Sequence, residues 1–354
     1  MRHLRLLAVA PRPCDDELLS CWHWRVSSHY SISPQQVEDW ITRSSGGQHP
    51  SFFSRDFHPD RAASRSWALA CRLQQADLER LSLQSTERSR ASFVSDPVHR
   101  GVCPACLDED AERGRDHYCR RSWACIESVT CPWHGIGLEI NCSRCFRSGL
   151  FQFRSTLAGV VRLFCRDCNA VVSARSFRRR DQADMVQIAS VISDAIVTGG
   201  PELERIAKAC RFLWAPTSDG APYITSLGLP LPFGRRPSAS TDIAPLTKLS
   251  PAWRAVTIAA IAGLLFGMSS ETKRLPSSAR TAFREFELEP TVPDPYAPLA
   301  AQLTSPLKLR PEPEYRQLAS DIIRSQAWKS LPPKSGRARN RAIGKLMLRA
   351  LNDG

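Results

Sequence analysis

The chain has 354 residues, of which 42 % are hydrophobic, and its formal net charge is +13. This length allows two or three domains, and the hydrophobic fraction excludes a largely disordered chain. The basic residues are 41 Arg and seven Lys. Because guanidinium groups bind phosphates through paired hydrogen bonds, this charge favours nucleic acid over a membrane surface as partner, with simple solubility as the alternative.

Apolar segments long enough for export or membrane insertion are not expected. The longest apolar run, residues 255–267, is shorter than the roughly 20 residues that span a bilayer. Near the N-terminus the apolar patch covers only residues 6–10, whereas an export signal needs about 7–15. We therefore expect a cytoplasmic protein, in which the thirteen cysteines are metal ligands rather than disulfides.

Residues 1–100 predict an N-terminal region of short helices. Apolar residues recur at helical spacing in residues 18–26, and Ser33-Pro34-Gln35-Gln36 has the pattern of a capping box before a helix with Val37, Trp40 and Ile41 on one face. Further apolar stripes in residues 67–73 and 78–81 are separated by a break at residues 74–77. Two helices about this break would form either a helix-turn-helix that reads DNA or an ordinary helical hairpin.

Residues 101–180 contain a metal-binding motif. Read from Cys103, the spacing is C-x2-C-x24-C-x2-H-x7-C-x2-C-x19-C-x2-C. Thirteen randomly placed cysteines would give only about half of one C-x2-C pair, whereas this stretch has three such pairs and a C-x2-H. A C-x2-C turn directs two sulfurs at one centre, and two turns complete the tetrahedron that Zn²⁺ prefers.

The spacing thus predicts two structural zinc ions with sequential ligand sets. The first set is Cys103, Cys106, Cys131 and His134; the second is Cys142, Cys145, Cys165 and Cys168. An interleaved arrangement, in which one site takes the first and third pairs, is the alternative. Pro104 and Pro132 favour knuckle-like loops, and we expect Cys119 and Cys125 to be small buried residues rather than ligands.

Catalysis is not expected at sites with four protein ligands and no open position. The acids at residues 15–17 and 108–110 form runs typical of a surface, and no carboxylate triad for Mg²⁺ stands out. A nuclease or integrase is therefore not predicted.

Residues 181–354 predict a C-terminal helical region with proline-rich linkers. One helix runs through residues 185–195 and ends at Gly199-Gly200, and a buried helix spans residues 253–268. Residues 216–251 and 276–313 are rich in proline and predict linkers, and further helices are expected near residues 315–328 and 337–351. The expected fold is mainly α, with an N-terminal helical, helix-turn-helix-like region, tandem zinc fingers with small β or knuckle modules, and a C-terminal helical region.

Two basic segments are candidates for nucleic-acid contact. Runs of arginine neutralise phosphates, although they also form solvated helix faces. Arg120-Arg121 is a further candidate, whereas we expect Trp123 in a core. The candidates in the two segments are Arg175, Arg178, Arg179 and Arg180, and then Arg337, Arg339 and Arg341.

The residues around the first predicted zinc site resemble the TniQ family. The resemblance is carried by CPACLDED at residues 103–110, Tyr118, RRSW at 120–123, CPWHG at 131–135, Leu138 and Cys142-x2-Cys145. The segment from Pro11 to Arg25 also resembles the family's opening, roughly P-x-P-D-E-S-L-S-S-W-x-x-R, with Leu18 and Cys21 where serines are usual. The similarity covers about residues 8–170.

The resemblance implies a non-catalytic targeting subunit of bacterial transposons, with a helix-turn-helix region and a zinc-finger domain. Family members recruit an AAA+ ATPase regulator and, through it, the transposase; some contact DNA, others dock on a CRISPR effector complex, and some are dimers. The leading interpretation is a DNA-targeting adaptor of transposition. A stand-alone zinc-finger transcription regulator is the alternative.

Overall fold

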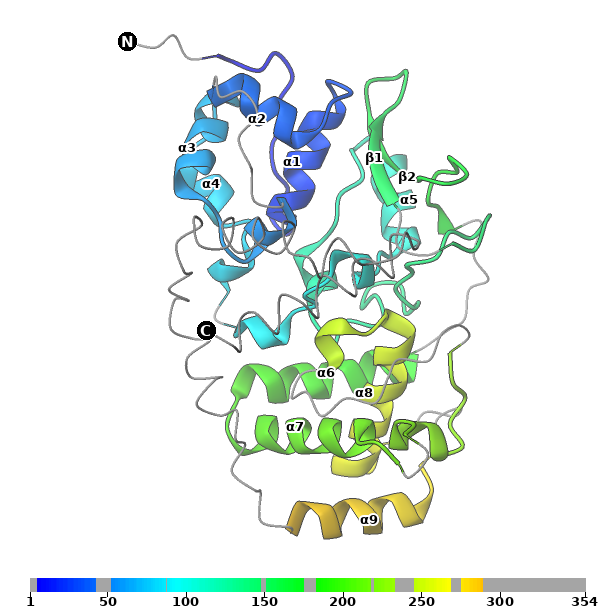
Figure 1. Cartoon of the computed structure of the whole chain (residues 1–354). Coiled ribbons are helices and arrows are strands. Elements are labelled where there is room, and N and C mark those ends of the chain that lie inside the picture. The colour runs from blue at the N-terminus through cyan, green and yellow to red at the C-terminus, as the bar shows by residue number, and fades with distance from the viewer. Residues whose placement is uncertain are drawn as a thin grey trace, which may run out of the picture. The chain divides into compact units, whose positions relative to one another are not determined.

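Four helices form the N-terminal part of the computed structural model, which describes residues 5–42, 52–86, 88–147, 151–174, 183–217, 220–232, 245–268 and 275–288 (Figure 1). They are α1 (Leu19–Ser28), α2 (Pro34–Thr42), α3 (Arg61–Ala70) and α4 (Gln75–Glu79). Trp22 and Trp67 are fully buried and meet edge to face, with ring centroids 5.7 Å apart. This aromatic contact joins α1 to α3 at the centre of the N-terminal core.

Local signals in the sequence explain where α2 begins. Ser33 N donates to Gln36 Oε1 at 2.9 Å and Gln36 N donates to Ser33 Oγ at 3.3 Å, so the predicted capping box is present. The predicted helix is present with Val37 and Ile41 buried, whereas Trp40, which was expected on the same face, is 41 % exposed. It lies over Arg5, whose guanidinium carbon is 5.3 Å from the ring centroid.

α3 and α4 form a helical hairpin, but the break between them covers residues 71–74 rather than the predicted 74–77. α3 ends at Ala70, and Arg72 turns the chain with a left-handed φ of +57°. α4 is only five residues long and buries Leu78. DNA reading by this hairpin stays a prediction.

The middle of the chain contains α5 (Pro104–Glu112) and a two-stranded antiparallel sheet, β1 (Phe151–Ser155) and β2 (Val161–Cys165). The register pairs Phe151 with Cys165 and Ser155 with Val161. Short 3-10 helices supply much of the remaining regular structure; they cover Phe52–Asp56, Leu83–Ser85, Arg90–Ser92, Pro97–His99, Arg121–Ala124, Tyr223–Ser226 and Pro245–Lys248. The buried core of this part includes Leu107, Trp123 and Leu138.

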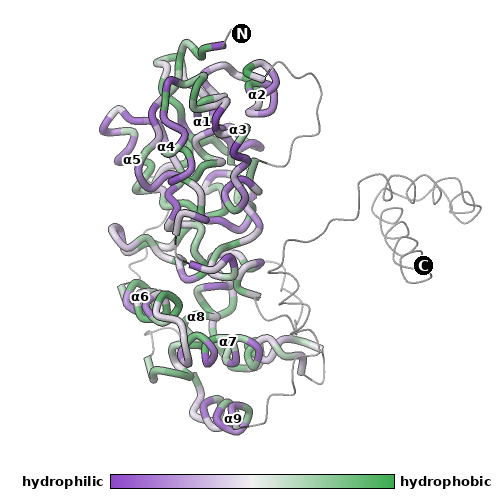
Figure 2. The backbone as a smooth tube through the Cα atoms, turned by 90° about the vertical axis from the view of Figure 1, so that its left-hand side faces the viewer, coloured by the Kyte–Doolittle hydropathy of each residue, from purple (hydrophilic) through white to green (hydrophobic). Residues whose placement is uncertain are grey.

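The C-terminal helices are α6 (Ala183–Thr198), α7 (Pro201–Trp214), α8 (Pro251–Leu265) and α9 (Ser277–Leu288). α7 packs against α6, α8 and α9 (Figure 1), and the apolar stretches of α6 and α8 appear green in Figure 2. α6 ends as predicted at Gly199, whose φ is +71°. The linker predicted from residue 276 was wrong at its start, since residues 277–288 form a helix; α7 was not predicted.

Within Met1–Leu288, which form one compact unit, the C-terminal helices share a core with earlier residues. Val94, Ile126 and Val129 belong to the same buried cluster as Trp214 and Ile258. No described helix is long and apolar enough to cross a membrane. The mainly helical fold expected from the sequence is confirmed.

Candidate metal centres

The first cluster joins the start of α5 to a tight turn 25 residues further along the chain. Cys103 is the N-cap residue of α5, Pro104 follows at its first position, and Cys106 lies in its first turn. The knuckle expected at Cys103–Cys106 is therefore the start of a helix, in which Pro104 is favourable because its fixed φ suits the first helical position. Cys131 and His134 come from the turn.

Distances in the first cluster fit a tetrahedral ion. His134 Nδ1 lies 3.5 Å from Cys103 Sγ and 3.4 Å from both Cys106 Sγ and Cys131 Sγ. Cys106 Sγ and Cys131 Sγ are 3.6 Å apart. Because zinc–sulfur distances of about 2.3 Å place tetrahedral sulfurs roughly 3.8 Å apart, one Zn²⁺ fits among these four atoms.

Glu109 orients the histidine of this cluster. The Nε2 atom of His134 lies 2.9 Å from Glu109 Oε1, on the side of the ring opposite the sulfurs. A metal on Nδ1 leaves Nε2 protonated, so Nε2 donates to the carboxylate, as is usual for histidine ligands. Hydrogen bonds from Cys103 and Cys106 lower the pKa of the Cys131 thiol and favour its thiolate, whereas the pKa values of Cys103 and Cys106 are raised within the same cluster.

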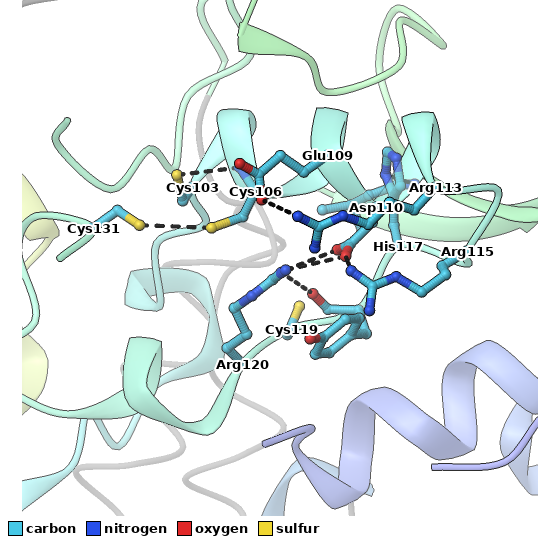
Figure 3. Close-up of polar contacts among 12 residues, drawn as sticks. Cys103, Cys106, Glu109, Asp110, Arg113, Arg115, His117, Cys119, Arg120 and Cys131 are labelled. Carbon is cyan, nitrogen blue, oxygen red and sulfur yellow. Dashed lines mark hydrogen bonds and ion pairs between the residues drawn. The ribbon is translucent and has the colours of Figure 1, made fainter. Parts of the chain in front are cut away.

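A buried ion pair supports α5 behind the cluster (Figure 3). Asp110 is fully buried and accepts from Arg120 Nη2 at 3.0 Å and from Arg115 Nη2 at 3.1 Å. The Arg120 guanidinium also lies over the rings of Tyr118 and Trp123, at 4.3 and 4.9 Å from their centroids. The ion pair between Asp110 and Arg120 thereby connects α5 to the segment that lies between Cys106 and Cys131.

The turn that carries Cys131 recurs twice in the second cluster. In each copy the cysteine carbonyl accepts from the backbone N–H four residues later, at 2.9 Å for Gly135, 2.8 Å for Phe146 and 3.0 Å for Asn169. These three residues have φ of +60°, +58° and +57°. The left-handed conformation explains the glycine after His134 and defines one knuckle geometry for Cys131, Cys142 and Cys165.

The second cluster is closed by the β-hairpin. Cys142 and Cys145 precede β1, Cys165 ends β2, and Cys168 lies in the turn that follows. Cys142 Sγ is 3.5 Å from Cys168 Sγ, and Cys145 Sγ is 3.6 Å from Cys165 Sγ. Burial acts to raise the pKa of Cys142, but backbone N–H groups of Cys145 and Arg144 together lower it to about 7.

Both clusters could hold a metal ion, because the four ligand atoms of each lie within 4.8 Å of one another. The arrangement is sequential rather than interleaved. Each set would fill all four tetrahedral positions with protein donors, which is the arrangement of structural zinc sites.

The predicted surface character of the acidic runs was wrong for Glu17 and Asp110, whereas Asp108 is partly exposed. Glu17 and Asp110 are fully buried, and Glu17 binds Arg25 with an oxygen–nitrogen distance of 2.7 Å. Asp108 accepts from the backbone N–H of Ala174 at 2.9 Å and so ties α5 to the segment after β2. These roles depend on distant partners, which the local sequence does not reveal.

The cysteines between the halves of the first set differ in environment. Cys125 is buried, as expected, and accepts from Arg88 Nη1 at 3.1 Å. Cys119 is only partly buried, and its N–H donates to Cys21 Sγ at 3.0 Å. Neither is among the groups of described residues that could hold a metal.

The predicted nucleic-acid contacts fall largely outside the described residues. This applies to all seven arginines of the two basic segments, at positions 175, 178, 179, 180, 337, 339 and 341. Arg120 was wrongly considered a candidate, since it is buried on Asp110. Arg121 donates to the carbonyls of Arg80 and Asp15, at 2.6 and 2.9 Å. Trp123 is buried as expected.

Comparison with known proteins gives one informative match. No curated protein matches the chain. The TniQ family model matches residues 8–138, a range that contains α1 to α5 and the whole first cluster but ends before the second. The resemblance to the TniQ family is therefore confirmed over residues 8–138.

Proposed function

We propose that this chain is a non-catalytic, DNA-targeting adaptor of bacterial transposition, which recruits an AAA+ ATPase regulator and, through it, the transposase. The observation that carries this proposal is the TniQ match over residues 8–138, which implies a role associated with transposition. Recruitment of the ATPase and binding of a CRISPR effector complex or of a second copy are family properties that this chain would share.

The metal clusters support an adaptor rather than an enzyme. Four protein donors at each cluster complete a tetrahedral shell and leave no position for a substrate or an activated water. The zinc ions would thus hold the chain segments of each module together, because the free energy of binding a structural zinc is folding free energy.

The buried acids also support this proposal. Glu17, Asp56 and Asp110 are each engaged by an arginine, through ion pairs with Arg25, Arg100 and Arg120 respectively. Carboxylates that catalyse phosphoryl transfer instead converge on Mg²⁺ in an accessible site. These acids are therefore best explained as structural partners of buried arginines.

DNA binding would be mainly electrostatic in this proposal. The net charge of +13 is appropriate for a phosphate-rich partner. We propose phosphate contacts for the seven arginines of the two basic segments, whose loss should reduce the dependence of affinity on salt by about one unit per contact.

A reconstituted transposition reaction tests the function. The element's transposase and ATPase regulator are combined with donor and target DNA, with and without this chain, and the insertion sites are mapped. We expect the chain to direct insertions to particular sites and to neither cleave nor join DNA alone. If the frequency and positions of insertion are the same in both reactions, the targeting role is wrong and a stand-alone transcription regulator becomes the better explanation.

A further inference from the structure

The tip of the second cluster presents an aromatic ring to solvent among arginines. Phe146 is 80 % exposed, and the side chain of Arg147 beside it is 72 % exposed. Arg144, in the same knuckle, and Arg166, in the opposite knuckle, are also exposed. The two knuckles are adjacent, since Arg147 Nη1 lies 3.7 Å from Asp167 Oδ1. Arg144, Phe146, Arg147 and Arg166 are called the Phe146 tip below.

The zinc module of the second cluster and that of the first cluster differ in charge. Residues 141–174 contain five arginines and one acid, whereas residues 101–140 contain four arginines and seven acids. Among the described residues, no ion pair is formed by Arg144 or Arg166, while Arg147 has only its 3.7 Å contact with Asp167. The second module therefore carries a positive surface suited to phosphates, and the first does not.

The backbone of Phe146 gives a second indication. Its φ of +58° is left-handed, and the equivalent positions of the other two knuckles hold Gly135 and Asn169. Glycine and asparagine are the residues that adopt this conformation most readily, whereas a bulky residue there is strained. Phe146 is thus unfavourable for the turn and contributes little to a core, so an interaction outside the chain is the better explanation for it.

We propose that the Phe146 tip binds DNA at an unpaired base, with the arginines on flanking phosphates and the phenyl ring stacked on the base. This proposal deepens the proposed function and depends on its DNA-binding part. Stacking requires a base whose face is accessible, which a bulge or a distorted step offers and a regular duplex does not. Because the Phe146 side chain is 80 % exposed, it can stack on a base without displacing contacts within the protein.

Substitution of Phe146 by glycine separates binding from folding. Phe146→Gly relieves the left-handed strain, so zinc content and unfolding free energy should be unchanged or improved. Affinity of the full zinc-loaded chain is measured by fluorescence anisotropy for a duplex, the same duplex with one bulged base, and an RNA of the bulged sequence. We expect Phe146→Gly to weaken binding to bulged DNA about tenfold or more while hardly changing the duplex affinity.

Two further variants test the role of the arginines and provide a control for the aromatic ring. The double variant Arg144→Ala, Arg166→Ala should weaken binding to both DNA probes and reduce the salt dependence by about two units. Trp133→Ala is the matched control, because Trp133 is a 65 % exposed aromatic residue in the knuckle of the acidic module. It should leave all three affinities unchanged. If Phe146→Gly loses zinc, Phe146→Asn, which copies Asn169, replaces it.

The outcomes distinguish this proposal from the proposed function. Equal affinity of Phe146→Gly and the unchanged chain for bulged DNA overturns the stacking role, even if insertions are still targeted. A tenfold loss supports the tip, even if reconstitution shows no targeting. Tighter binding to the RNA than to bulged DNA, or loss of a protein partner without loss of DNA affinity, contradicts the assignment to DNA.

Discussion

At the scale of single residues, Glu109 has the clearest effect on the first cluster. It fixes His134 through one hydrogen bond of 2.9 Å, with Nδ1 directed at the three sulfurs. The position of Glu109 on α5 makes this possible, since it follows the ligand Cys106 by almost one helical turn. The carboxylate is 43 % exposed. Its contribution to metal affinity should therefore lie at the lower end of the range that carboxylate partners of histidine ligands provide.

We expect Glu109→Ala to weaken metal binding at the first cluster by about tenfold, because carboxylate partners of histidine ligands typically contribute 10- to 100-fold. Competition with a chromophoric chelator measures the affinity of each of the two sites. Glu112→Ala is the control, because Glu112 is exposed on the same helix and contacts no ligand of the cluster. Equal affinities for the two variants would exclude the orienting role.

His117 is the residue that should make stability depend on pH. It is 1 % exposed, and its Nδ1 accepts from the backbone N–H of Leu163 at 3.1 Å, which only the neutral ring can do. Burial, together with the nearby Arg162, lowers the pKa of His117 to about 3. Below its ordinary value of about 6.5 the unfolded chain therefore binds a proton that the folded chain does not.

The free energy of unfolding should accordingly fall as pH decreases from about 6.5 toward 3, by up to about 1.4 kcal/mol per pH unit from this residue. His117→Asn keeps an acceptor near the Nδ1 position but cannot titrate. Denaturant unfolding at several pH values compares the two proteins. Between pH 6 and 4, the free energy of unfolding of the variant should depend less steeply on pH. An unchanged dependence would show that other groups cause it.

At the scale of elements, α5 depends on the metal site at its start. Cys103 caps the helix, with its sulfur 3.5 Å from the backbone N–H of Cys106. Pro104 fixes the first helical position but provides no N–H of its own. An ion on Cys103 and Cys106 would hold the first turn in place.

We expect Cys106→Ser to remove one of two zinc ions per chain and to loosen α5, because a structural zinc contributes its binding energy to folding. Elemental analysis gives the metal content, and hydrogen exchange reports on the amides of α5. Cys119→Ser is the control and should retain both ions, since Cys119 lies in the same segment without joining either cluster. One ion or none in the unmodified, reduced chain would contradict the two-site assignment.

The sequence predicted those elements whose signals are local. The C-x2-C spacing places two ligands on one turn through covalent geometry alone, and the capping box at Ser33 marks the start of α2. α7 had comparable signals, with Pro201 at its first position and acids in its first turn, so it was predictable. α5 has the same proline signal at its first position, but the burial of Asp110 was not predictable, because it depends on an ion pair with Arg120 that forms only in three dimensions.

At the scale of the whole molecule, Arg254 connects α8 to the segment that precedes the knuckle of the first cluster. It is fully buried, and Nη1 donates to the carbonyls of Cys125 and Ile126 at 2.8 and 3.0 Å. Nη2 donates to the carbonyl of His99 at 3.3 Å. The sequence could not predict this contact, which spans 129 residues and places an arginine inside a largely apolar helix.

The three carbonyls that accept from Arg254 all lie within residues 8–138, the part of the chain that matches the TniQ family, while Arg254 lies beyond it. Burial lowers the pKa of Arg254 to about 10, so the guanidinium stays charged near neutral pH and its hydrogen bonds are charge-assisted. The carbonyl of Cys125 also accepts from the backbone N–H of Ser128 at 3.2 Å, so loss of Arg254 would remove the donor mainly from the carbonyls of Ile126 and His99.

We therefore expect Arg254→Met to lower the free energy of unfolding by at least about 2 kcal/mol, since each buried acceptor left unsatisfied costs about 1–3 kcal/mol. Methionine retains the apolar volume within α8, so the loss reports on hydrogen bonding rather than on a cavity. Arg284→Met, at an exposed position of α9, is the matched control and should change stability by less than about 0.5 kcal/mol. Denaturant unfolding measures both, and hydrogen exchange at Cys125 and Ile126 locates the effect. If the two variants are equally stable, solvent or a rearranged side chain donates hydrogen bonds to these carbonyls instead. Arg254 then does not hold α8 to residues 8–138.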